Sequence, residues 1–83
     1  MMGIVYRKQA VKYINSLDSQ TKQRIKDGIL GLTCHPPQGD IKLLRGIRDG
    51  SRRLRVGGYR IIYRVEKDEI TIDKIDSRGG IYK

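Results

Sequence analysis

The stretch between positions 45 and 64 is rich in arginine. It holds seven arginines and one acidic residue, Asp49. The arginines are Arg45, Arg48, Arg52, Arg53, Arg55, Arg60 and Arg64. A guanidinium group is planar, stays charged at neutral pH and donates paired hydrogen bonds, so it suits phosphate. The cluster therefore predicts a binding site for a phosphate-bearing ligand. The alternative is a solvated strand face on which arginine stems cover apolar surface.

The segment after Asp76 adds two further residues that could do chemistry, Arg78 and Tyr82. A tyrosine close to several cations has a lowered pKa, because the cations stabilise its phenolate. Such a group could take the proton of a ribose 2′-hydroxyl or stack on a base. Taken alone, a tyrosine at this place is more often a packing residue, so the prediction depends on its arginine neighbours.

The remaining polar residues give no second site. His35 and Cys34 are the only histidine and the only cysteine, and together they do not make a metal-ligand set. Asp73 and Asp76 could be read as a carboxylate pair, but charge balance on a strand is the simpler account. We therefore expect no metal and no cofactor.

The arginines need a sheet to bring them together, and the sequence predicts one. Alternation of apolar and basic residues runs through positions 53–56 and 59–65, with the turn-forming pair Gly57-Gly58 between them. A two-residue turn there places Arg55 directly opposite Arg60, with Arg53 one step along the same face. Like charges opposed on a sheet are destabilising. A sheet that keeps three close guanidinium groups on one face is therefore expected to bind an anion there.

The other elements follow from spacing. We expect a short strand at 3–7, a helix from about Lys8 to Leu17, and a second helix capped by Asp18 or Ser19 and stopped by Pro36-Pro37. Gly39 and Asp40 mark a loop. A third meander strand runs over about 69–76, where a bulge after Ile72 would bring Ile70, Ile72 and Ile75 to one face. The predicted fold class is thus α+β: a short N-terminal strand, a helical hairpin covering one sheet face, then a three-stranded antiparallel meander.

Composition limits the class of protein. The 83 residues carry 18 basic and nine acidic side chains, a formal net charge of +9. That length predicts one domain over residues 1–83 with a thin core, and that charge predicts a polyanionic partner. No secretory signal or transmembrane stretch is expected, and a single cysteine fits a reducing compartment. We therefore expect a cytoplasmic protein with no membrane partner.

Three segments resemble the RelE/ParE toxin superfamily over nearly the whole chain. The most specific part is Arg55-Val56-Gly57-Gly58-Tyr59-Arg60-Ile61-Ile62-Tyr63. It is flanked by Leu43-Leu44-Arg45-Gly46 and by the segment from Ile75 to Tyr82. The resemblance implies a microbial RNase-like fold and the toxin of a type II toxin–antitoxin system. In the RelE-like branch, it implies cleavage of mRNA in the ribosomal A site without metal, by attack of the 2′-hydroxyl on the adjacent phosphate.

Site residues follow from the same resemblance. Arg60 and Arg78 match the arginines that hold the scissile phosphate, and Tyr82 matches the C-terminal tyrosine that orients the nucleotide or activates the hydroxyl. We expect the RNA to be bound by Arg45, Arg52, Arg53, Arg55 and Arg64. Some RelE toxins carry lysine where this chain has Arg53 and Arg55, and arginine is a poor proton donor. Directly after Arg78, where the family usually has charged residues, this chain has Gly79 and Gly80.

Partners and rival functions also follow. The resemblance implies the ribosome, mRNA and a cognate antitoxin, and the basic surface predicts acidic residues in the helical segment of that antitoxin. The main alternative is a ParE-like inhibitor of DNA gyrase that cleaves nothing. A second is a basic RNA-binding module without catalysis.

Overall fold

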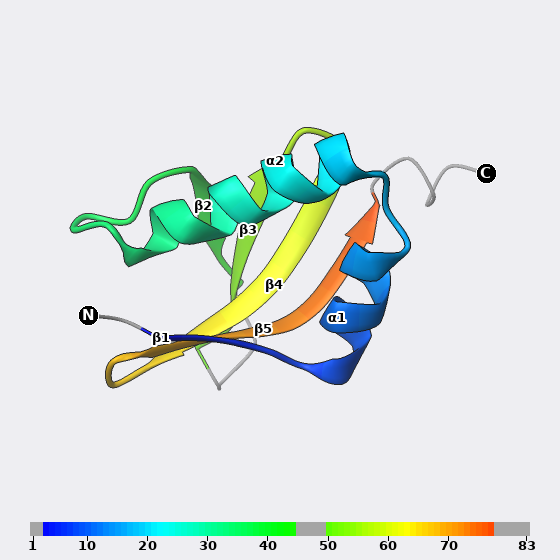
Figure 1. Ribbon diagram of the computed structural model, residues 1–83. Helices are drawn as coiled ribbons and strands as arrows, with labels where there is room; N and C mark the ends of the chain where they lie inside the picture. Colours follow the sequence, from blue (N-terminus) through cyan, green and yellow to red (C-terminus); the bar gives the residue numbers. More distant parts are fainter. Residues whose placement is uncertain (1–2, 45–49, 78–83) are drawn as a thin grey trace.

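The computed structural model describes residues 3–44 and 50–77. In these ranges two α-helices cover one face of a five-stranded mixed sheet (Figure 1). The predicted α+β class, with the helices on one face, is confirmed. None of the helices in the described ranges is long and apolar enough to cross a membrane.

The sheet extends the predicted meander at both edges. In chain order its strands are β1 (Gly3–Tyr6), β2 (Asp40–Leu43), β3 (Arg52–Val56), β4 (Tyr59–Glu66) and β5 (Glu69–Ser77). They lie side by side in the order β1-β5-β4-β3-β2. Strand β1 runs parallel to β5, and every other neighbouring pair is antiparallel. The predicted meander is β3-β4-β5, to which β1 and β2 add the edge strands.

The hairpin between β3 and β4 has the expected register. Arg55 lies directly opposite Arg60. Gly57 has a φ of 58°, a conformation that glycine adopts without a steric penalty. The two-residue turn therefore places the two guanidinium groups on the same face of neighbouring strands.

The predicted bulge in β5 is also present. The register between β4 and β5 shifts by one residue after Ile72, which leaves Asp73 without a partner on β4. The extra residue reverses the alternation, so Ile72 and Ile75 both point into the core and are fully buried.

Helix α1 (Lys8–Asn15) packs on β5, and helix α2 (Ser19–Leu30) packs on β3. Of the two caps expected for α2, Asp18 is the one used: its carboxylate accepts a hydrogen bond from the Thr21 N–H at 3.1 Å. Hydrogen bonds from the side chain of Thr21 and from its backbone N–H lower the pKa of Asp18, because they stabilise the charged carboxylate.

Both helices end earlier than the sequence predicted. Helix α1 ends at Asn15 rather than Leu17, because the next two N–H groups bond to carbonyls three residues back and tighten the last turn. Helix α2 ends at Leu30 and continues as a 3₁₀ helix over Gly31–Thr33, well before the Pro36-Pro37 pair. The prolines follow the helix without terminating it.

Strand β2 begins at Asp40, where the sequence predicted a loop at Gly39 and Asp40. Its four residues pair with β3 along their whole length, and Lys42 lies opposite Arg53. So short a strand depends on hydrogen bonds from its neighbour for its stability, which explains why its own sequence did not reveal it.

The core lies between the helices and the sheet. It is built almost wholly from aliphatic side chains, with one tyrosine: Ala10, Ile14, Ile25, Ile29, Leu32, Leu54, Ile61, Tyr63, Ile70, Ile72 and Ile75. All the sheet residues in it point toward the helices, which leaves the opposite face available for polar side chains.

Helix α2 approaches β3 closely at Gly28. A Cβ atom at this position would stand 2.6 Å from Cγ2 of Val56. We therefore expect Gly28→Ala to lower the free energy of unfolding in urea by about 1 kcal/mol, because overpacking exceeds the gain of about 1 kcal/mol in helix propensity. Gln20→Ala on the exposed side of α2 is the control, with an expected change within about 0.5 kcal/mol. A more stable Gly28→Ala variant would contradict this packing.

Candidate active site

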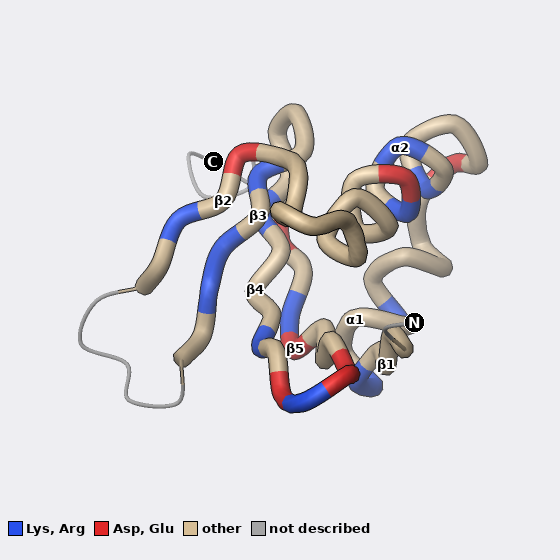
Figure 2. Tube along the Cα trace, turned by 90° about the vertical axis from the view of Figure 1, so that its left-hand side faces the viewer, with Lys and Arg blue, Asp and Glu red and all other residues tan. Residues whose placement is uncertain are grey.

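The helix-free face of the sheet carries most of the expected arginines. Arg53 and Arg55 point to this face because Leu54 between them is buried in the core. Arg60 and Arg64 extend the row on β4. We call the surface formed by Arg53, Arg55, Arg60 and Arg64 the arginine face. Figure 2 shows the basic positions along β2 and β3, on the side of the molecule away from α2.

Arg60 is held in place by a carboxylate on the neighbouring strand. Its Nε and Nη2 atoms donate hydrogen bonds to the two carboxylate oxygens of Asp76, each at 3.2 Å. Asp76 lies directly opposite Arg60 in the β4–β5 ladder. The Arg60 side chain nevertheless remains 42% exposed. It is therefore oriented in advance and still accessible to an anion, as a phosphate-binding group must be.

Arg53 is the most buried of the charged groups on the arginine face. Its side chain is 14% exposed, and Nη2 donates to Oδ1 of Asp40 at 3.2 Å. Its Nε atom is buried and has no hydrogen-bond acceptor among the described residues. A buried charged donor without an acceptor is costly, and an oxygen from a bound ligand would remove that cost.

A groove of about 620 Å³ opens between these side chains. Its described walls come from β2, the residue after it, β3 and β4: Lys42, Leu43, Leu44, Arg53, Arg60 and Ile62. Three of the six are cations and three are aliphatic. This combination fits a ligand that carries both a phosphate and an apolar ring face, as a nucleotide does.

Arg64 and Arg55 lie on the arginine face but outside the described walls of the groove. Arg64 donates to both carboxylate oxygens of Asp73, at 2.7 and 3.0 Å, and contacts Glu66 at 3.4 Å. Arg55 is exposed and has no ion-pair partner among the residues described. The charge-balancing role expected for Asp73 and Asp76 is thus observed as two cross-strand pairs with arginine.

Arg52 does not share the arginine face. It lies opposite Tyr63 and points toward the helices. There it hydrogen-bonds the Tyr63 hydroxyl and lines a second groove with residues that follow α2. The sequence grouped it with the others because adjacent positions in a strand look alike until the register is known.

Three of the expected site residues, Arg45, Arg78 and Tyr82, lie outside the described residues. Lys42 is the groove residue that sequence reasoning missed. The available signal was the polar–apolar alternation of Asp40-Ile41-Lys42-Leu43, which is typical of a strand with one solvated face.

The sequence model of the family described as the ParE toxin of the type II toxin–antitoxin system parDE matches residues 4–82. The chain belongs to the RelE/ParE toxin superfamily. A comparison with curated protein sequences gave no match.

Solved structures of similar chains show the same fold as this toxin. The RelE–RelB complex from Pyrococcus horikoshii OT3 matches at 29% identity and a TM-score of 0.76, over 94% of this chain and 96% of that one. The RelB–RelE antitoxin–toxin complex from Methanococcus jannaschii matches at 28% identity and a TM-score of 0.73, over 94% of each chain. The intact RelBE toxin–antitoxin complex from E. coli matches in fold, at 22% identity and a TM-score of 0.69, over 93% of this chain and 96% of that one.

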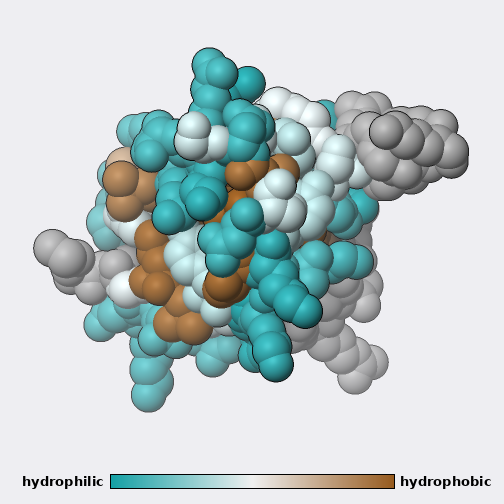
Figure 3. Space-filling view, turned by 45° about the vertical axis from the view of Figure 1, so that its right-hand side comes forward, coloured by the Kyte–Doolittle hydropathy of each residue, from teal (hydrophilic) through white to brown (hydrophobic). Residues whose placement is uncertain are grey.

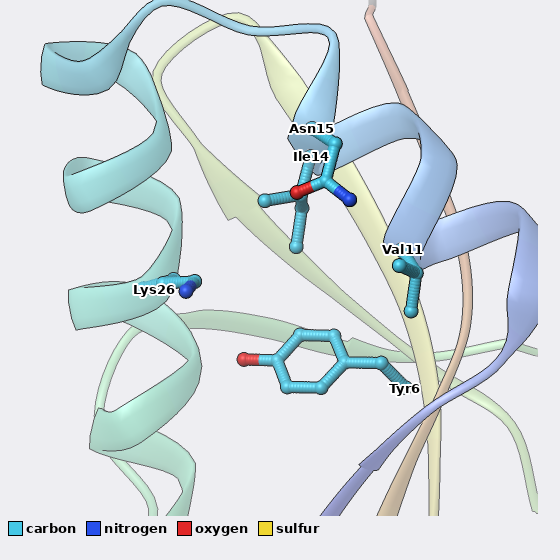
Figure 4. Close-up of a pocket in the computed structure, with 5 residues that line it drawn as sticks. All are labelled: Tyr6, Val11, Ile14, Asn15 and Lys26. Atoms are coloured by element: carbon cyan, nitrogen blue, oxygen red, sulfur yellow. The ribbon is translucent and has the colours of Figure 1, made fainter.

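A further cleft of the toxin lies on its helical side. It is lined by Tyr6, Val11, Ile14, Asn15 and Lys26 and measures about 120 Å³. The Tyr6 ring lies between α1 and α2 with its hydroxyl toward α2 (Figure 4), and small apolar patches are scattered among polar side chains where α1 comes forward (Figure 3). Burial raises the pKa of Tyr6, so its phenol stays neutral. Among its described lining residues the cleft has a single cation, Lys26, whereas the groove on the arginine face has three, so the groove is the better candidate for phosphate chemistry.

The raised pKa of Tyr6 means that the toxin should lose stability at alkaline pH. The neutral phenol is favoured in the folded chain, so its contribution is complete below a pH of about 10 and is lost as the pH rises through the higher folded pKa. We expect Tyr6→Phe, which keeps the ring and cannot ionise, to lose less stability than wild type between about pH 8 and about pH 11. Urea unfolding at the two pH values measures this, and equal losses would contradict it.

Proposed function

We propose that this toxin is a ribosome-dependent endoribonuclease, a single domain over residues 1–83 that cleaves mRNA in the A site without metal. The 2′-hydroxyl of one nucleotide would attack the adjacent phosphate, giving a 2′,3′-cyclic phosphate and a new 5′-hydroxyl. The observation that carries the proposal is the groove in which Arg60, oriented by Asp76, lies beside Arg53 with its buried, unpartnered Nε.

Charge stabilisation is the main contribution that such a groove can make. Negative charge builds on the phosphate oxygens as the new P–O bond forms, and preorganised cations stabilise that charge without reorganising. Arg60 would bind the phosphate, together with Arg78. Tyr82 would orient the nucleotide or accept the 2′-hydroxyl proton.

The remaining arginines would bind the RNA backbone. Arg53 and Arg55 suit this role by their place on the arginine face. RNA binding by Arg45, Arg52 and Arg64 remains a prediction. Arg64 is already paired with Asp73, and Arg52 points toward the helices.

A cognate antitoxin is the expected protein partner. Two of the similar structures at 28 and 29% identity are toxin–antitoxin complexes, and the net charge of +9 favours an acidic helical segment in the partner. Such a partner would associate quickly, and its association rate would fall as salt is added. The proposed substrate places the toxin in the cytoplasm, with ribosomes and mRNA.

A second candidate function is inhibition of DNA gyrase without cleavage. It is favoured by the match of residues 4–82 to the ParE toxin family. The arginine face would then serve as a docking surface for an acidic region of the partner.

One experiment separates the two candidates. The purified toxin is added to a translation system, and mRNA ends are mapped by primer extension, with a ribosome-free control and a parallel gyrase supercoiling assay. Codon-phased cuts that require ribosomes support the nuclease. Intact mRNA with blocked supercoiling supports the gyrase inhibitor, and ribosome binding with neither effect leaves an RNA-binding module.

A further inference from the structure

We propose that Lys42 is the proton donor of the cleavage reaction, protonating the 5′-oxygen that leaves the phosphate. This inference rests on the nuclease function proposed above. It assigns a role that arginines alone do not fill.

The reaction needs such a donor. As the bond from the 2′-oxygen to phosphorus forms, the bond from phosphorus to the 5′-oxygen breaks, and the electron pair stays on that oxygen. The 2′-hydroxyl proton leaves to a base or to water, and the 5′-oxygen gains a proton to become a hydroxyl. An alkoxide is a poor leaving group, so transfer of that proton in the transition state accelerates the step. Guanidinium holds its protons too tightly to donate one, whereas an ammonium group can release one.

The fold places Lys42 where this proton is needed. Lys42 lies on β2 directly opposite Arg53 of β3, so the two side chains share one face of the sheet. Both line the groove together with Arg60. Among the described residues that line the groove, Lys42 is the one cation that is not an arginine.

The neighbouring charges leave the ammonium group of Lys42 available to a ligand. Asp40, two residues away on the same strand face, accepts a hydrogen bond from Arg53, and Asp76 accepts hydrogen bonds from Nε and Nη2 of Arg60. No carboxylate among the described residues pairs with Lys42. Its side chain is exposed.

A simpler role for Lys42 has to be distinguished. Strand β2 is an edge strand, and a lysine on an edge discourages pairing with another chain. A positive charge is sufficient for that role, and also for binding an RNA phosphate. Arginine would therefore replace lysine in either role, but it would not replace a proton donor.

The test uses Lys42→Arg and Lys42→Gln in the ribosome-dependent cleavage assay, with Lys12→Gln on exposed α1 as the matched control. Two mRNAs are compared, one natural and one with sulfur in place of the 5′-bridging oxygen at the cut site. A thiolate leaves without protonation, so the sulfur substrate does not need a general acid. Thermal unfolding checks that each variant is folded.

We expect both Lys42 variants to cut the natural mRNA at least about 100-fold more slowly than wild type. They should cut the sulfur substrate at nearly the wild-type rate, and Lys12→Gln should match wild type on both. A fully active Lys42→Arg, or equal losses on the two substrates, would overturn the inference and leave a role in charge or binding. Failure of the wild-type toxin to cut either mRNA would instead overturn the nuclease function, and the inference with it.

Discussion

Arg60→Ala is expected to slow ribosome-dependent cleavage by about 10²- to 10³-fold, the usual effect of removing one preorganised group that stabilises developing negative charge. Arg60 has the geometry for this role, since Asp76 holds its Nε and Nη2 at 3.2 Å while 42% of the side chain stays exposed. Single-turnover cleavage of programmed ribosomes, followed by gel analysis of the mRNA, gives the rate.

Two further variants show whether the guanidinium group itself matters. Arg60→Lys keeps a positive charge beside Asp76 but cannot donate two parallel hydrogen bonds, so most of the loss should remain. Arg24→Ala removes an exposed arginine from α2, on the far side of the sheet, and should leave the rate unchanged. Wild-type cleavage by Arg60→Ala would remove Arg60 from the mechanism.

Ile61→Ala is expected to lower the free energy of unfolding by about 2–5 kcal/mol. Ile61 is completely buried on β4, a strand with neighbours on both sides. A chain of 83 residues has a total stability of about 4–12 kcal/mol. One truncation could therefore remove a large part of the stability of the toxin.

Urea unfolding followed by circular dichroism measures this loss. Val65→Ala is the matched control, because Val65 lies on the same strand but is 37% exposed. It should cost no more than about 1 kcal/mol. Similar losses for the two variants would show that the core is not centred on β4 as the structure has it.

Several local features could be predicted because each depends on neighbours in the chain. The Gly57-Gly58 turn determines the register that places Arg55 opposite Arg60. The spacing of Ile72 and Ile75 requires a bulge, and the bulge is there. The side chain of Asp18 caps α2 through Thr21, three residues away. The turn and the bulge follow from short-range rules, and the cap was limited by the same kind of rule to two residues, of which the structure uses Asp18.

Other features depended on partners distant in the sequence. Strand β2 forms because β3 offers it hydrogen bonds, and its four residues carry too weak a pattern to indicate a strand alone. Without β2, Lys42 could not be placed beside Arg53, and Asp40 could not be recognised as the partner of that arginine. Because the register of the strands was not known from the sequence, Arg52 was grouped with the arginines of the arginine face.

The sequence by itself determined the α+β class, the central hairpin, the bulge and the basic character of the toxin. It did so because turn geometry, alternation and net charge are properties of neighbouring residues or of composition. Only the tertiary structure decided which carboxylates pair with Arg53, Arg60 and Arg64, which residues line the groove and where the two edge strands pair. Those contacts join residues from different strands, and an isolated stretch of chain cannot specify its partner across a sheet until the sheet has formed.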